Sequence, residues 1–175
     1  MKKYVNAFAL IVSLATVAAC SNNDSPATPS GTSTRTFTAT LRPSEEVPAV
    51  TGAESAGGGT ATITLTATTD AAGNVTAGTA TFAVNLNGFP AGTPINMAHI
   101  HQAAVGQNGN VVVSTTLAPG EVTLPAGGGT FNRSGIAVTP DLAAQLISNP
   151  AGFYFNVHST LNPGGVARGQ LVRVQ

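Results

Sequence analysis

The sequence has few charged residues, few aromatic residues and a single cysteine. Charged residues make up 8% of its 175 residues, against about a quarter in an ordinary globular domain. Seven basic residues balance seven acidic ones, which argues against a nucleic-acid-binding protein because such proteins need a basic face. One cysteine excludes an intrachain disulfide framework and a cysteine-rich zinc site. With 5% aromatic residues and no tryptophan, the chain lacks platforms on which nucleobases could stack.

The N-terminal segment has the pattern of an export signal. Lys2 and Lys3 give it a basic start, and a mostly apolar run follows over residues 7–19. That run is shorter than the roughly 20 residues that span a bilayer, but it suits the apolar part of a secretory signal. It ends in Val17-Ala18-Ala19-Cys20, which resembles a bacterial lipobox. The pattern predicts a lipoprotein signal peptide over residues 1–19 and lipidation of Cys20; the alternative is an ordinary signal region with a buried cysteine.

The remaining chain divides into a tether and one domain. Residues 20–35 are predicted to form the lipidated cysteine and a flexible tether, because residues 21–34 contain no apolar side chain larger than alanine. Residues 36–175 are long enough to fold around one core. We therefore expect a protein of the cell envelope, held to a membrane by its lipid. In a host with two membranes the outer one is favoured, because Ser21 rather than aspartate follows the cysteine.

Alternation of apolar residues with threonine predicts an all-β domain. Such alternation is typical of antiparallel sheets with one face in water. One segment differs, because Thr139–Ser148 has helical spacing, with Thr139 as the expected N-cap and Asn149-Pro150 as its end. The prediction is an antiparallel Greek-key β-sandwich with one short helix. Strands are expected at Arg35–Leu41, Gly59–Thr68, Val75–Leu86, Asn96–Gln102, Asn110–Leu117, Gly129–Phe131, Phe153–His158 and Ala167–Val174.

The three histidines are the candidate metal ligands. His99 and His101 lie two residues apart in one predicted strand, so their side chains project from the same face. His158 ends another strand and shares a face with Tyr154 and Asn156. If the two strands are neighbours, three imidazoles converge and could bind zinc or copper. Alternatively, the imidazoles form a structural polar cluster that anchors the glycine-rich loops after His101 and His158.

No residue pattern predicts a catalytic site. The sequence has no nucleophile elbow and no phosphate-binding loop with a following lysine. Glu45 and Glu46 lie side by side in a proline-flanked loop. We interpret them as a solvated turn rather than as a general acid and base.

Several blocks of this sequence resemble the CHRD domain, a module named after chordin and found in exported bacterial proteins. The blocks are Glu46-Val47-Pro48, Ala98-His99-Ile100-His101 before Gly106–Val112, Phe155–Ser159 before Asn162–Gly165, and Arg168-Gly169-Gln170-Leu171. The resemblance covers residues 36–174 and implies an extracellular β-sandwich, but no reaction, since the family has no established general activity. Two departures are Gln102-Ala103-Ala104, where the family often has glycine, and Val166-Ala167, where an acidic residue usually precedes the arginine.

The histidine pattern is also similar to copper,zinc superoxide dismutase. His99, His101, His158 and Arg168 would be the corresponding positions, so a shared fold is plausible. The bridging histidine, the zinc ligands and the disulfide cysteines of that enzyme are missing, so dismutase activity is not expected. We expect a non-enzymatic binding or structural module whose partner is an envelope or extracellular protein or a glycan. The alternative is a copper- or zinc-binding protein in which Tyr154, Asn156 and Arg168 neighbour the metal ligands.

Overall fold

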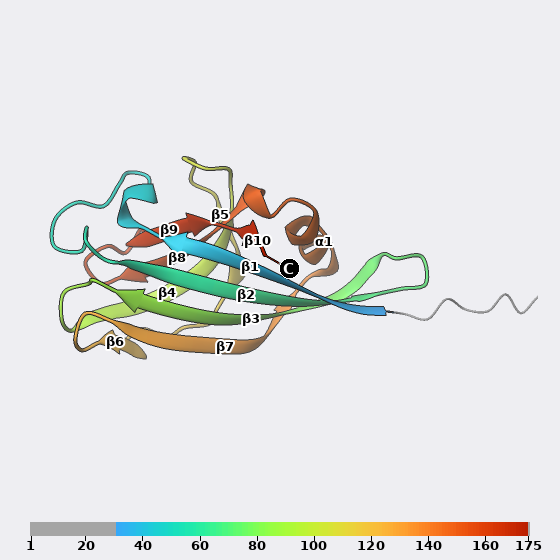
Figure 1. Ribbon diagram of the computed structural model, residues 1–175, viewed down its shortest axis with the longest axis horizontal. Coiled ribbons are helices and arrows are strands. Elements are labelled where there is room, and N and C mark those ends of the chain that lie inside the picture. The colour runs from blue at the N-terminus through green and yellow to red at the C-terminus, as the bar shows by residue number, and fades with distance from the viewer. Residues whose placement is uncertain (1–30, 175) are drawn as a thin grey trace, which may run out of the picture.

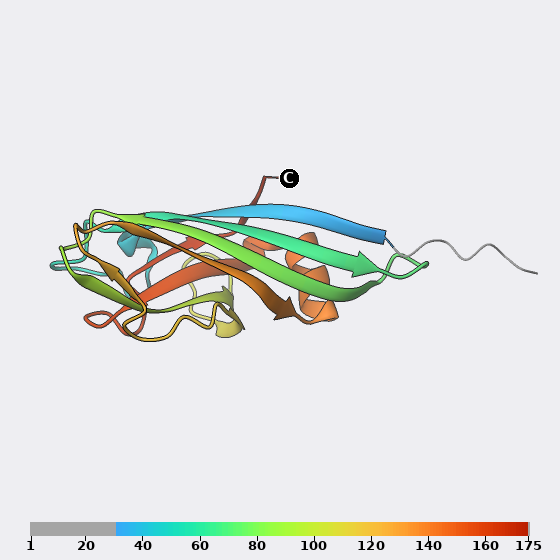
Figure 2. The same ribbon diagram turned by 90° about the horizontal axis from the view of Figure 1, so that it is seen from below.

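The structure, a computed structural model that describes residues 31–174, consists of two antiparallel sheets packed face to face (Figures 1 and 2). Sheet A has the strand order β10-β1-β2-β3-β7, and sheet B has the order β5-β4-β8-β9 with β6 paired to β4. This arrangement confirms the predicted all-β sandwich with one short helix. The strands of sheet A are β1 (Gly31–Leu41), β2 (Gly58–Thr69), β3 (Val75–Asn87), β7 (Gly129–Val138) and β10 (Val172–Arg173). Those of sheet B are β4 (Thr93–Gln102), β5 (Asn110–Ser114), β6 (Val122–Leu124), β8 (Phe153–Ser159) and β9 (Ala167–Gln170).

The core lies between the inner faces of the two sheets. In sheet A the threonines face outward, while alternate residues such as Phe37, Ile63 and Phe82 are buried. In sheet B the inward residues include Ile100 and Phe155, and the rings of Phe82 and Phe155 have centroids 5.8 Å apart. Burial of these apolar side chains is the main contribution to the stability of the packing between the two sheets.

Helix α1 (Pro140–Ser148) connects β7 to β8 and covers the end of sheet A that extends past sheet B (Figure 2). It buries Ala143 and Leu146. Thr139 occupies the predicted N-cap position, but its side chain makes no capping hydrogen bond. Two single turns of 3-10 helix, Pro43–Glu45 and Pro150–Gly152, complete the regular structure. Within residues 31–174 no helix is long and apolar enough to cross a membrane.

The element boundaries differ from the sequence predictions at several places. Strand β4 begins at Thr93 rather than Asn96, and β5 ends at Ser114 rather than Leu117. The strand predicted over Ala167–Val174 is divided into β9 in sheet B and β10 in sheet A. The first strand begins at Gly31 rather than Arg35, because residues 31–34 pair with residues 66–69 of β2. Residues 31–35 therefore belong to the sheet and not to the predicted tether. Strand β7 continues to Val138, and β6 was not predicted at all. Residues 1–30, which include the predicted signal peptide and Cys20, lie outside the described part of the chain.

The pairing of β4 with β8 positions the candidate site. These strands are antiparallel neighbours in the middle of sheet B, with His99 opposite Asn156 and His101 opposite Tyr154. Because Ile100 of β4 and Phe155 of β8 face the core, the residues that alternate with them form the outer face of sheet B.

Candidate metal centre

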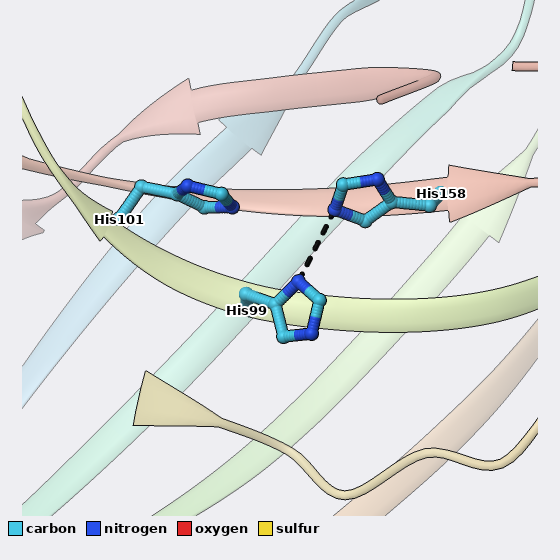
Figure 3. Close-up of side chains that lie close together, drawn as sticks. All are labelled: His99, His101 and His158. Carbon is cyan, nitrogen blue, oxygen red and sulfur yellow. Dashed lines mark hydrogen bonds between the residues drawn. The ribbon is translucent and has the colours of Figure 1, made fainter. Parts of the chain in front are cut away.

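Three imidazoles meet on the outer face of sheet B (Figure 3). His99 and His101 come from β4 and His158 comes from β8. His99 Nδ1 lies 3.2 Å from His158 Nε2. Each ring offers one nitrogen such that all three nitrogens lie within 4.8 Å of one another. The convergence predicted from the sequence is therefore found, and we call these residues the His cluster.

Backbone carbonyls fix the orientation of two of the rings. His101 Nδ1 lies 2.9 Å from the carbonyl oxygen of Gly109, and His158 Nδ1 lies 2.9 Å from that of Pro163. A carbonyl only accepts hydrogen bonds, so each Nδ1 must carry the proton and each Nε2 keeps its lone pair. The lone pair of His158 Nε2 accepts the hydrogen bond from His99 Nδ1–H. His101 Nε2 is buried and has no hydrogen-bond partner among the described residues. Both contacts also anchor loops, as the structural interpretation of these histidines predicted.

The surroundings keep the rings neutral. Burial, together with the neighbouring His158 and His101 rings, lowers the pKa of His99 to about 4. Burial also lowers the pKa of His101, where the carbonyl of Gly109 acts in the opposite direction and Arg168 adds to the lowering. For His158 burial again lowers the pKa, against the effect of the Pro163 carbonyl. Neutral imidazole is the form that binds metal ions.

The geometry of the three nitrogens suits one metal ion. Two nitrogens on the same tetrahedral zinc, each about 2.0–2.1 Å from the metal, are about 3.3 Å apart. The separation of 3.2 Å between His99 Nδ1 and His158 Nε2, which are hydrogen-bonded to each other, is close to this value. Metal-bound histidines commonly donate their other N–H to a carbonyl, as His101 and His158 do here. Three imidazoles suit zinc or copper and would leave a fourth position for another ligand.

The predicted neighbours Tyr154 and Arg168 support the His cluster from one side. The Tyr154 ring stacks on His101 with an interplanar angle of 6° and a centroid distance of 4.8 Å. The Arg168 guanidinium lies 4.6 Å from the centroid of the same tyrosine ring. Tyr154 Oη also accepts a hydrogen bond of 3.3 Å from the backbone N–H of Gly109, the residue whose carbonyl binds His101. The tyrosine therefore holds the ring and its loop in place together.

Arg168 is buried and connects two loops to sheet B. Its Nε donates to the carbonyl of Glu45 at 2.5 Å, and its Nη1 donates to the Gln107 carbonyl and to Asn108 Oδ1. Its acidic partner is Glu46, whose Oε2 lies 3.7 Å from Arg168 Nε. The sequence resemblance implied an acidic residue just before this arginine; here a distant loop supplies one.

The interpretation of Glu46 as part of a solvated turn was wrong. Its side chain is 7% exposed and accepts a hydrogen bond of 3.0 Å from Asn156 Nδ2. Burial raises the pKa of Glu46 from its ordinary value of 4.5 to about 7, although Arg168 acts to lower it. Only the Glu46-Val47-Pro48 block of the family resemblance pointed to this position. Asn156, the third predicted neighbour, thus links β8 to this loop.

The loop after β8 is held by a second buried acid that sequence reasoning missed. Glu54 is 3% exposed and accepts hydrogen bonds from Ser159 Oγ at 2.6 Å and Asn162 Nδ2 at 2.5 Å. Since this loop carries the Pro163 carbonyl that binds His158, Glu54 contributes to the orientation of that ring.

Comparison with known proteins agrees with the resemblance seen in the sequence. The family model of the CHRD domain matches residues 37–171. No match was found among curated proteins or among solved structures, so the likeness to superoxide dismutase stays a prediction. The matched region includes the His cluster, Glu46 and Arg168 and covers most of the chain. The chain belongs to the CHRD domain family.

Proposed function

We propose that this protein is a non-enzymatic metal-binding module of the cell envelope, and that the His cluster binds one copper or zinc ion. The observation that supports this most is the convergence of three imidazole nitrogens within 4.8 Å of one another. Two of these rings have their Nδ1–H groups bound to backbone carbonyls, so the unprotonated Nε2 atoms carry the lone pairs that could ligate a metal. A CHRD domain by itself indicates a binding or structural module.

The structural role of the histidines and metal binding are compatible. The contacts that anchor the loops use Nδ1 of His101 and His158, whereas ligation would use Nε2. An imidazole needs only one of its nitrogens for each task. By contrast, the third ring, His99, is hydrogen-bonded through Nδ1 to the imidazole of His158 rather than to a loop, which a purely structural anchor would not require.

The location is proposed from the N-terminal sequence. Cys20 follows a basic start, a short apolar run and small residues, which together support lipidation. The lipid would hold the domain at the envelope, on the outer membrane where the host has two. There the neutral His cluster would be ready to bind a metal ion.

Elemental analysis tests metal binding directly. Full-length protein, solubilised in detergent, is stripped with a chelator, incubated with an excess of copper(II) or zinc(II), and desalted before the metal and protein are quantified. We expect about one metal ion per chain, and loss of at least nine-tenths of it in the double variant His99→Ala, His101→Ala. The control is Gln102→Ala, because Gln102 is an exposed residue of the same strand. This variant should bind as much metal as the unchanged protein. Absence of stoichiometric metal, or retention by the double variant, contradicts the proposal.

A further inference from the structure

Met97 lies on the same face of sheet B as the His cluster. It precedes His99 by two residues in β4, and Ala98 between them is buried in the core. Alternation along the strand therefore turns Met97, His99 and His101 to the outer face. Met97 is half-buried, yet it is not one of the half-buried apolar residues that pack against the core. Met97 therefore lies on the face of the sheet that carries the imidazoles.

The register of the sheet brings Met97 close to two of the three rings. Met97 is paired directly with His158 across the β4–β8 ladder, next to a bulge between Ile95 and Met97. Directly opposite residues have Cβ atoms about 4.5–5.5 Å apart, and residues two apart on a strand are separated by about 6.6–6.8 Å. Bulges re-aim side chains and occur often near functional sites. A methionine, with three rotatable side-chain bonds, can reach across such distances.

We propose that the Met97 sulfur is the fourth ligand of a copper ion held by the His cluster. This inference rests on the proposed function, because it requires that the three imidazoles bind a metal. Soft thioether ligands favour copper(I), whereas zinc sites in proteins are built from histidine, cysteine and carboxylate ligands. A set of three imidazoles and one thioether therefore selects copper(I) over zinc. It also makes the donor set complete without a ligand from outside the chain.

Competition titrations test the selectivity. Full-length Cys20→Ser protein, in which no thiol is left to compete, is titrated with copper(I) under anaerobic conditions against a colorimetric copper(I) chelator, and with zinc(II) against a zinc dye. Met97→Leu keeps the volume and apolar character of the side chain but removes the sulfur. We expect this change to weaken copper(I) binding at least tenfold and to leave zinc(II) binding within twofold. Equal copper(I) affinity in the two proteins overturns the inference.

X-ray absorption at the copper edge gives an independent readout. The copper(I)-loaded Cys20→Ser protein should show sulfur in the first shell together with nitrogen, and the sulfur signal should be absent after Met97→Leu. If the copper in the protein that keeps Met97 is coordinated by nitrogen and oxygen alone, Met97 is not a ligand. Failure of the proposed function looks different, because the protein with Met97 intact would then bind neither metal in the titrations.

Discussion

Glu46 is a residue whose protonation chemistry departs far from its ordinary behaviour. Its buried carboxyl group accepts a hydrogen bond from Asn156 and lies close to Arg168. Burial raises the pKa of this carboxyl group to about 7. Because its pKa is higher in the folded than in the unfolded chain, the protonated form favours folding. The stability that Glu46 contributes is therefore fully present below pH 4.5 and is lost as the pH rises through about 7.

Replacing Glu46 with glutamine should remove this pH dependence. A rise from 4.5 to about 7 corresponds to about 3 kcal/mol at most. We expect Glu46→Gln to match the unchanged protein in free energy of unfolding near pH 4.5 and to exceed it by about 2–3 kcal/mol at pH 8. Urea denaturation of both proteins across this range measures the difference.

Comparing two proteins isolates the contribution of Glu46. The imidazoles have lowered pKa values, so they reduce stability as the pH falls through 6.5, which is the opposite direction. Both proteins carry the same histidines, and this effect cancels in the difference. A stability difference that stays constant from pH 4.5 to pH 8 would show that Glu46 ionises normally.

At the level of residues, the face on which a strand residue lies could be predicted from the sequence, whereas contacts made by loops could not. The shared face of His99 and His101 follows from strand alternation alone. The ring nitrogen that each histidine leaves free depends on the carbonyls of Gly109 and Pro163, which belong to loops. Burial of Glu46 depends on a contact with Asn156, 110 residues later in the chain. Neither loop conformation nor such a distant contact leaves a periodic signal in the sequence.

At the scale of elements, the loop after β8 controls the orientation of His158. Its Gly165 has φ of 138°, and a Cβ there would lie 2.5 Å from Asn156 Nδ2 and 2.7 Å from Glu46 Oε1. Gly164 beside it has open space around the position of a Cβ. The two glycines are therefore a matched pair, one constrained by the site and the other not.

Alanine substitutions at these glycines test the role of the loop. Gly165→Ala should lower the free energy of unfolding by about 2 kcal/mol or more, from backbone strain and the clash with buried polar groups. Gly164→Ala should change it by less than about 0.5 kcal/mol. Thermal or urea unfolding of the two variants provides the comparison, and equal effects at both positions would contradict this view of the loop.

Strands were easier to predict where the alternation of apolar and polar residues extended over many residues. Strands β2 and β3 alternate over more than ten residues, and their predicted ends agree with the structure within one residue. Strand β6 has three residues, too few for alternation to be recognised. The start of β1 was missed because Gly31–Thr34 has no apolar side chain; pairing with β2, rather than burial, makes it a strand.

At the scale of the whole molecule, the proposed lipid anchor decides where the domain works. The described structure begins at Gly31, eleven residues after Cys20. Replacing Cys20 with serine should abolish lipid labelling and release the protein from membranes, because one side chain provides the attachment site. Fractionation after metabolic labelling with a fatty acid measures both effects. Membrane retention of the Cys20→Ser protein would show that the anchor is wrongly assigned.

The sandwich leaves the His cluster on the outer face of sheet B, supported by loops rather than buried in the core. The central claim is that this cluster holds a copper ion. Anomalous diffraction from crystals of the copper-loaded protein, collected on both sides of the copper absorption edge, tests it most directly. We predict one anomalous peak about 2.0–2.2 Å from His99 Nδ1, His101 Nε2 and His158 Nε2. A map without a peak at these three nitrogens, or with its copper bound elsewhere on the chain, would contradict the account.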